Sequence, residues 1–167
     1  MARVDIAIDA TKPLAREPGV GHNRWHPEIG PIARCQSGDT LVIETRDALD
    51  GQVTPETTSA DLRSIDQGVI HPMTGPVHVE GAQPGDFLEV EILDIEPAAF
   101  GYTVQSPGFG FLRDFFHDHY LVKWRLGGGF AVSDQLPGIR IPADLFMGII
   151  GVAPDEALRK RAVARET

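Results

Sequence analysis

Residues 36–44 read QSGDTLVIE and residues 83–91 read QPGDFLEVE, so one pattern occurs twice in the chain. In each copy a Gly-Asp pair, which is typical of a tight turn, precedes a run in which a Leu is followed two residues later by Ile or Val. A period of two places the apolar side chains on one face of a β-strand. We therefore predict two equivalent strands, over residues 40–46 and 86–95, in a sandwich or barrel.

Working outward from this pattern, short apolar runs bounded by Gly and Pro predict further strands. One helix is expected over residues 153–167, because Pro154, Asp155 and Glu156 suit a helix start. The prediction is a mainly β chain, β-sandwich or jelly-roll-like, with long loops and a short C-terminal helix, as a single domain over residues 1–167. The further predicted strands are residues 3–9, 76–80, 120–126, 130–132, 139–141 and 148–152, with a long loop at 11–34 and a helical turn near 59–65.

The composition excludes several functional classes. An apolar fraction of 42% and a charged fraction of 23% are ordinary for a globular domain and exclude a disordered chain. A net charge of −9 and a pI near 5.0 disfavour nucleic-acid binding. No apolar run is long enough to suggest a membrane span or a signal peptide. Cys35 is the single cysteine, which fits a reducing compartment, so we expect a cytoplasmic protein.

Polar residues are densest over residues 66–81, DQGVIHPMTGPVHVEG, where Gly and Pro restrict the backbone. Polar groups on such a backbone are suited to a binding or catalytic site. His71 could ligate a metal or act as a general base, and Glu80 could bind a metal or accept a proton from water. The alternative interpretation is turn chemistry beside a polar sheet face, which His78 and Glu80 would share.

Two histidine pairs carry weaker signals. His117 and His119, beside acidic residues, could bind one metal if the segment is extended, but an acidic surface loop is favoured. His22 and His26 are four residues apart, but the flanking Gly and Pro argue against a helical metal pair. Trp25, between them, could line a pocket.

Two remaining features favour structural interpretations. Residues 44–51 (ETRDALDG) run from a strand into an Asp-rich stretch, which predicts an Asx-type turn. Nothing in the sequence activates Cys35, so a small buried hydrophobic residue is favoured over a nucleophile.

Successive blocks of the sequence are similar to those of the acetamidase/formamidase family, in the same order over nearly the whole chain. The pattern HP-x-TGP-x-x-VEGA-x-PGD, at residues 71–86, is the most specific of them. The other blocks are HNRWHPEIGP (22–31), ETRDALDGQ (44–52), LEVEILDIEP (88–97), GFGFLRDFF (108–116), SDQLPGIRIP (133–142) and GIIGVAPDE (148–156).

The resemblance implies an amidohydrolase that converts short aliphatic amides, formamide and acetamide, to ammonia and a carboxylate. Some relatives act on lactams. It also implies a cytoplasmic, mainly β homo-oligomer and a divalent metal, with zinc as the expected ion.

Carried over by position, the resemblance implies Asp66 and His71 as metal ligands and Glu80 as a ligand or general base. His71 and Glu80 would then be the catalytic residues. A metal-activated water would attack the amide carbon, and Glu80 would pass a proton to the leaving ammonia. The substrate-binding residues it implies are Thr74, Gly75 and Trp25.

The chain departs from the family in length, because members are about twice as long and carry further acidic, glycine-rich motifs in their C-terminal half. Nothing of that kind follows Gly151. The chain therefore resembles the N-terminal half, which fits a truncated protein, a degenerate copy, or a subunit whose partner chain supplies the C-terminal half. The alternatives are a non-catalytic β-sandwich subunit and a small-molecule or metal-binding jelly-roll module without turnover.

Overall fold

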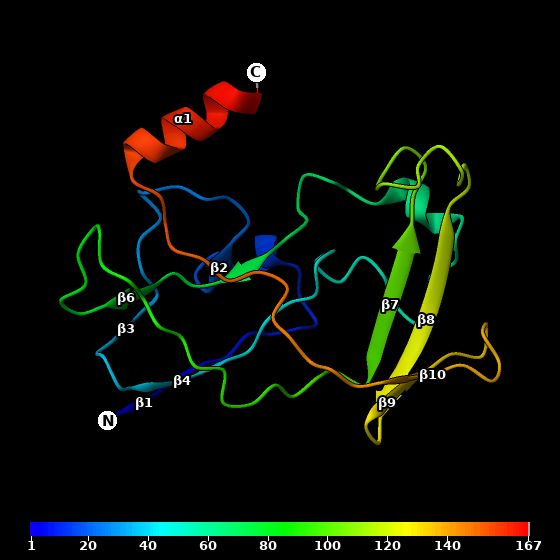
Figure 1. Cartoon of the computed structure of the whole chain (residues 1–167), viewed down its shortest axis with the longest axis horizontal. Helices are drawn as coiled ribbons and strands as arrows, with labels where there is room; N and C mark the ends of the chain where they lie inside the picture. The colour runs from blue at the N-terminus through cyan, green and yellow to red at the C-terminus, as the bar shows by residue number, and fades with distance from the viewer. Residues whose placement is uncertain (167) are drawn as a thin grey trace. The chain divides into compact units, whose positions relative to one another are not determined.

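The computed structural model describes residues 1–166 as a mainly β chain with long loops and one short C-terminal helix, which confirms the predicted fold class (Figure 1). The chain forms two compact units. The first unit comprises Met1–Gly51, Asp66–Glu89 and Ile149–Thr167, and the second comprises Gln52–Ile65 and Val90–Gly148.

Short paired strands organise the first unit. Each sheet has two strands, so the loops between them make up most of this unit. The parallel pairs are β1 (Arg3–Ile6) with β4 (Thr40–Ile43) and β3 (Ala33–Cys35) with β6 (Val77–Val79). β2 (Gly21–His22) pairs antiparallel with β5 (Met73–Thr74), and a 3₁₀ turn, η1 (Leu14–Arg16), precedes β2.

The second unit is built on a four-stranded antiparallel sheet in the order β10-β9-β8-β7. Leu121 on β8 is the most deeply buried side chain of this unit, with 1% of its surface exposed. The strands are β7 (Phe100–Gln105), β8 (Tyr120–Gly127), β9 (Phe130–Val132) and β10 (Arg140–Pro142), and a 3₁₀ turn, η2 (Asp61–Ser64), precedes them.

The expected C-terminal helix is present as α1 (Glu156–Glu166). Asp155 caps it, because its Oδ1 accepts a hydrogen bond from the Leu158 amide. Pro154 therefore precedes the cap and is not the first helical residue that the sequence suggested. Within the described residues, no helix has the length and apolar character needed to cross a membrane.

The repeated sequence pattern gives the same turn twice. In the first copy the Asp39 amide donates to the Gln36 carbonyl at 3.1 Å, and the Gln36 amide donates to Asp39 Oδ2 at 2.9 Å. In the second copy the Asp86 amide donates to the Gln83 carbonyl at 3.0 Å, and the Gln83 amide donates to Asp86 Oδ2 at 2.8 Å. The residues that the two copies share therefore form the same hydrogen-bonded turn.

The strands after the two turns differ, so the strand predicted at residues 86–95 is wrong. The first copy continues into β4, which pairs with β1, whereas residues 86–95 join no sheet in the part of the chain that the structure describes. Leu88, Val90 and Ile92 are 53%, 50% and 51% exposed. Alternation indicates which residues would share a face, but a strand also needs a backbone partner.

Two smaller predictions are also corrected. Residues 148–152 form no strand, and their apolar side chains are exposed. β7 was not predicted, although Phe100, Tyr102 and Val104 alternate with smaller or polar residues, and this strand pairs with β8 along its whole length.

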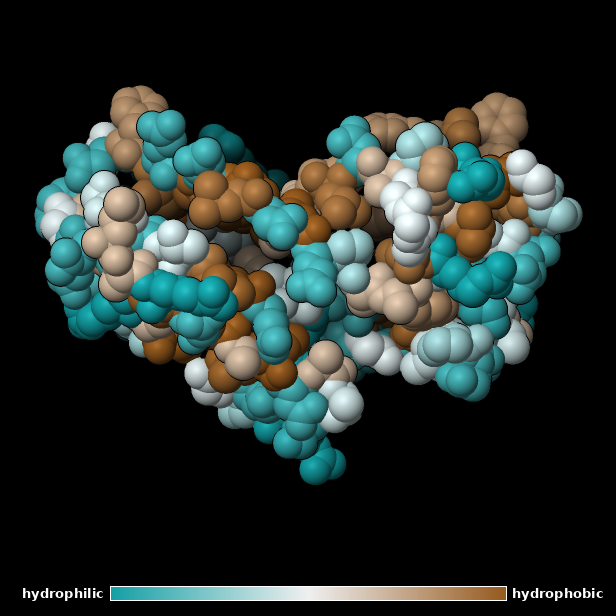
Figure 2. Space-filling view, turned by 90° about the horizontal axis from the view of Figure 1, so that it is seen from below, coloured by the Kyte–Doolittle hydropathy of each residue, from teal (hydrophilic) through white to brown (hydrophobic). Residues whose placement is uncertain are grey.

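Few apolar side chains are buried for a chain of this length, and Figure 2 shows hydrophobic side chains reaching the surface on the face drawn. Many large apolar side chains outside the small core are exposed. The buried apolar residues among those described are Ile6, Cys35, Val53, Leu62, Leu121 and Val122.

Candidate functional site

The loop at residues 66–71 carries two of the predicted site residues and is tied to the segment that follows β2. Asp66 Oδ1 accepts a hydrogen bond from the Gly68 amide at 2.7 Å, which closes a short turn. The Gly68 carbonyl accepts hydrogen bonds from Asn23 Nδ2 and Arg24 Nη2, both at 2.9 Å. These bonds connect the loop to Asn23 and Arg24, which lie 45 and 44 residues before Gly68 in the sequence.

His71 has an uncommon backbone conformation. Its φ is +57°, in the left-handed region that residues other than glycine seldom adopt. The conformation is held by a 2.7 Å hydrogen bond from the His71 amide to the Ala48 carbonyl. Backbone conformations of this kind concentrate at functional sites, so the geometry supports the choice of this position.

The predicted substrate-binding residues surround the β2–β5 pair. Thr74 Oγ1 donates to the Glu44 carbonyl at 2.7 Å, and the Gly75 amide donates to the Val20 carbonyl at 3.2 Å. Trp25 lies edge-on to the His22 ring, with 6.0 Å between ring centroids. Their substrate-binding roles stay predictions.

Glu80 lies just beyond β6 and is anchored by its neighbours. Its amide donates to the Cys35 carbonyl at 2.8 Å. Its carboxylate pairs with Arg34 Nη1 at 2.9 Å and lies 3.6 Å from His78 Nε2. The hydrogen bond from Arg34 holds the pKa of the Glu80 carboxyl group below its ordinary value. A carboxylate stabilised in this way is a weaker base than a free one.

The predicted metal ligands are not gathered in one place by the described residues. No group of three or more His, Cys, Asp or Glu side chains there is arranged to hold a metal ion. Asp66 closes its own turn and Glu80 pairs with Arg34. Asp66, His71 and Glu80 therefore do not fit a zinc ion by themselves, and the metal stays a prediction.

A cavity of about 380 Å³ lies in the first unit, beside the loop at residues 66–71. Apolar side chains contribute part of the wall and a few polar groups the rest, as is usual for small-molecule sites. The residues lining it are Leu14, Ala15, Pro18, Gly21, His22, Asn23, Arg24, Asp50, Gly68 and Val69.

Sequence reasoning missed the role of Asp50 in this wall. The predicted Asx turn is present, because Asp47 accepts hydrogen bonds from the Leu49 and Gly51 amides at 2.9 and 2.7 Å. Asp50, three residues on, is buried, and both its carboxylate oxygens accept from the Leu14 amide, at 3.0 and 2.9 Å. Arg46 Nε lies 3.9 Å from Asp50 Oδ1, and this i, i+4 charge pair was the available signal.

The other candidate groups contribute no site. His117 and His119 lie outside regular strands and belong to no metal-binding group within residues 1–166. Cys35 is buried, and burial raises the pKa of its thiol, with the Asp39 and Glu80 carboxylates acting in the same direction. A thiol with a raised pKa is a poor nucleophile, which fits the predicted structural role.

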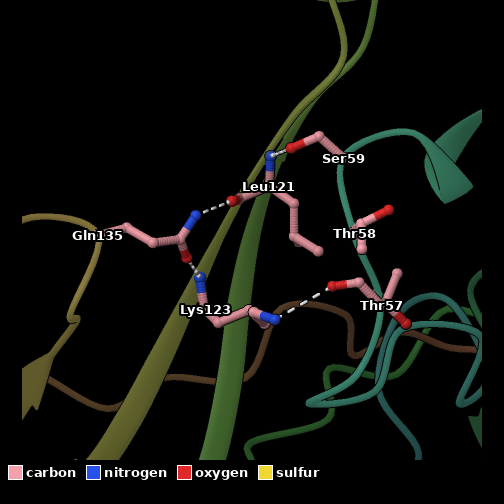
Figure 3. Close-up of a pocket in the computed structure, with 6 residues that line it drawn as sticks. All are labelled: Thr57, Thr58, Ser59, Leu121, Lys123 and Gln135. Atoms are coloured by element: carbon pink, nitrogen blue, oxygen red, sulfur yellow. Dashed lines mark hydrogen bonds between the residues drawn. The ribbon is translucent and has the colours of Figure 1, made fainter.

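A second cavity, of about 360 Å³, lies in the second unit (Figure 3). The side-chain amide of Gln135 bridges β8 there, accepting from the Lys123 amide at 2.8 Å and donating to the Leu121 carbonyl at 2.7 Å. Lys123 Nζ is bound by the Pro55 and Thr57 carbonyls at 2.7 and 3.2 Å. The polar groups of Gln135 and Lys123 in this second cavity are thus already hydrogen-bonded within the unit. The cavity of the first unit is therefore the stronger candidate site.

Comparison with known proteins gives a consistent match. A family model described as the acetamidase/formamidase family matches residues 7–167. An acetamidase from Mycolicibacterium smegmatis is 34% identical over 179 residues, covering 99% of this chain and 44% of that protein. A formamidase from Methylophilus methylotrophus is 32% identical, covering 92% of this chain and 39% of that protein.

A solved structure gives the same result for the fold. A gamma lactamase from Delftia acidovorans superposes with a TM-score of 0.92 at 30% identity, covering 99% of this chain and 42% of that one. The chain therefore spans less than half the length of the relatives that it matches.

Proposed function

Since the chain belongs to the acetamidase/formamidase family, we propose that it takes part in hydrolysing short aliphatic amides to ammonia and a carboxylate. The observation that carries this proposal is the match over residues 7–167, together with relatives named acetamidase and formamidase. The buried thiol of Cys35 fits a reducing compartment, and we place the protein in the cytoplasm.

His71 is the residue we propose as the proton acceptor. Its backbone is fixed by Ala48, and Glu80 is engaged by Arg34. In the hydrolysis, water adds to the amide carbon while the imidazole takes a proton from it. The C–N bond then breaks as the imidazolium returns that proton to the departing nitrogen. The products are ammonia and a carboxylic acid, which ionises at neutral pH.

We propose that a polypeptide carrying the C-terminal part of the family's length completes this enzyme. The accessible surface of the chain is 12484 Å², whereas a folded monomer of this mass exposes about 8,100 Å². The excess is larger than the roughly 600–1,500 Å² that two domains of one chain bury between them. Surface of this extent and apolar character is typical of an obligate interface.

Residues 86–95 are the part of that interface with the clearest partner chemistry. They have strong strand-forming alternation, exposed apolar side chains and no sheet partner among the described residues. Glu89 and Glu91 would face like charges if two copies of the segment paired around Val90, which is unfavourable. A strand with apolar and basic residues, added by the partner, suits the segment better. The expected homo-oligomer stays a prediction.

The activity is tested in a chimera in which this chain replaces the matched segment of the Mycolicibacterium smegmatis acetamidase. We expect ammonia release from acetamide to fall at least about a hundredfold in the His71→Ala chimera, as for loss of a general base. The matched control is His117→Ala, which removes an exposed histidine of the second unit and should retain activity. Equal activity in the two variants would refute the role of His71.

The interface is tested separately by hydrogen exchange. Amides of residues 88–94 should exchange rapidly in the chain alone and slowly in the folded chimera, because pairing protects them. Equally rapid exchange in both proteins would contradict the proposed partner strand, whatever the activity.

A further inference from the structure

The cavity of the first unit has a charged side chain in its wall that no opposite charge neutralises. Arg24 is exposed, and its hydrogen bonds go to two backbone carbonyls, those of Asn23 at 2.6 Å and Gly68 at 2.9 Å. Within residues 1–166 it forms no ion pair. Because a carbonyl oxygen has no net charge, the guanidinium keeps its positive charge at the wall of the cavity.

The carboxylate in the same wall belongs to Asp50 and is already engaged. Its side chain is 2% exposed, and both its oxygens accept from the Leu14 amide. Arg46, which also pairs with Glu17, lies 3.9 Å from it. The most accessible charge in the wall is therefore that of Arg24, so the cavity favours an anion.

The Arg24 guanidinium is held in place by the loop at residues 66–71. The Gly68 carbonyl accepts from Arg24 and also from Asn23 Nδ2, and the Gly68 amide donates to Asp66 Oδ1. A guanidinium has five N–H groups, so its two hydrogen bonds leave three of them uncommitted. Two N–H groups are enough for the parallel pair of bonds by which arginine binds a carboxylate.

The rest of the wall selects the kind of anion. Leu14, Ala15, Pro18 and Val69 contribute apolar surface to it. A bare inorganic ion gains nothing from such surface, whereas an alkyl chain is removed from water by it. The volume of about 380 Å³ lies in the range of sites for small organic ligands. An anion that carries an alkyl chain therefore fits this cavity better than an inorganic ion.

We propose that this cavity binds a short aliphatic carboxylate and that Arg24 is the residue that recognises it. Such a carboxylate has two sources, and this part of the inference rests on the proposed amide hydrolysis. It is either the acid that hydrolysis releases or a carboxylate at the far end of the amide substrate. Both sources give Arg24 the same role, which is to bind the anion, and neither gives it a part in proton transfer.

The test is butyrate binding to the chimera described above, labelled with ¹⁵N in its arginines. Butyrate has no amide bond, so its binding is measured without turnover. The Arg24 Nε resonance of the parent chimera should move saturably with butyrate. Butyrate binding, measured by saturation transfer to its methyl protons, should weaken at least about tenfold in Arg24→Gln, as for loss of a hydrogen bond to a charged group. Arg24→Lys should restore part of it, because lysine keeps the charge but not the paired donors.

The matched control is Arg16→Gln, which removes the same charge from an exposed residue of the same unit that does not line the cavity. This variant should bind butyrate as the parent does. An unmoved Arg24 resonance, or equal losses in the two variants, would overturn the proposal. Tighter binding of inorganic phosphate or of 1-butanol than of butyrate would overturn the assignment of an alkyl carboxylate.

Two kinetic measurements separate the sources. If the released acid occupies the cavity, acetate inhibits acetamide hydrolysis and Arg24→Gln weakens that inhibition. If the substrate carries the carboxylate, kcat/KM for succinamate, the monoamide of butanedioic acid, falls in Arg24→Gln while that for acetamide does not. No change in either would refute the link to hydrolysis. Butyrate binding by a chimera that releases no ammonia would refute the proposed hydrolysis alone, and ammonia release without butyrate binding would refute this inference alone.

Discussion

Replacing Asp50 with alanine should destabilise the first unit more than any change at an exposed ion pair. The Asp50 side chain is 2% exposed and the Arg46 side chain 6% exposed, so the pair is shielded from solvent. Truncating Asp50 leaves the Leu14 amide without its acceptor, which costs about 1.5–3 kcal/mol for a hydrogen bond to a charged group. Arg46 keeps its ion pair with Glu17, so its charge stays partnered. The φ of +55° adds less than about 1 kcal/mol, because aspartate carries a Cβ there too and differs from alanine in its local hydrogen bonding.

The free energy of unfolding, measured by urea titration, should therefore fall by about 1.5–4 kcal/mol in Asp50→Ala. Asp50→Asn should cost less, about 0.5–1.5 kcal/mol, because asparagine tolerates this backbone and keeps an acceptor for the Leu14 amide. The matched control is Asp5→Ala, which breaks an exposed pair with Arg3 and should cost about 0–1 kcal/mol. Equal losses in Asp50→Ala and Asp5→Ala would refute this reasoning.

Three further results are expected. Gly21→Ala should cost about 1–3 kcal/mol in urea unfolding, because its Cβ would lie 2.3 Å from the Met73 carbonyl oxygen; an unchanged midpoint would contradict this close approach. The pKa of Glu80 is lowered in the folded chain, so its contribution to stability is present above its ordinary pKa of 4.5 and is lost as the pH falls below it. Without the Arg34 guanidinium, in Arg34→Ala, this loss of stability below pH 4.5 should become smaller, and an unaltered dependence of stability on pH would exclude the pair. Cys35 should react with a thiol reagent at least about tenfold more slowly than in urea, since burial raises its pKa; equal rates would place it at the surface.

Several elements were predicted from a local period or a local cap, whereas β7, which alternates as clearly, was missed. The runs that became β4, β6 and β8 carry their own period, and the end of the chain carries its own cap in Asp155. The strand expected at residues 86–95 has an equally clear period, yet it lacks the neighbour that β1 supplies to β4. The alternation of apolar and polar residues therefore predicts a tendency to form a strand. Whether the strand forms depends on a neighbouring segment that pairs with it.

The sequence predicted the constrained loop that holds His71, whereas the roles of the site residues stay predictions. The Gly- and Pro-rich sequence around His71 indicated a constrained loop, and the structure has one. The ion pair between Glu80 and Arg34 joins residues that are 46 apart in the sequence, so no local pattern predicts it. The buried His22 Nδ1, which has no hydrogen-bond partner among the described residues, likewise depends on the folded structure. The predicted metal site would need ligands that the described residues do not bring together.

The most direct test of the account is ammonia release from acetamide by the folded chimera, measured beside the chain alone at the same concentration. The account predicts turnover by the chimera and none by the chain alone, because the chain spans less than half the length of its relatives. A chimera that is folded by circular dichroism but releases no ammonia would contradict the proposed amide hydrolysis. Equal turnover by the chain alone would contradict the need for a C-terminal partner.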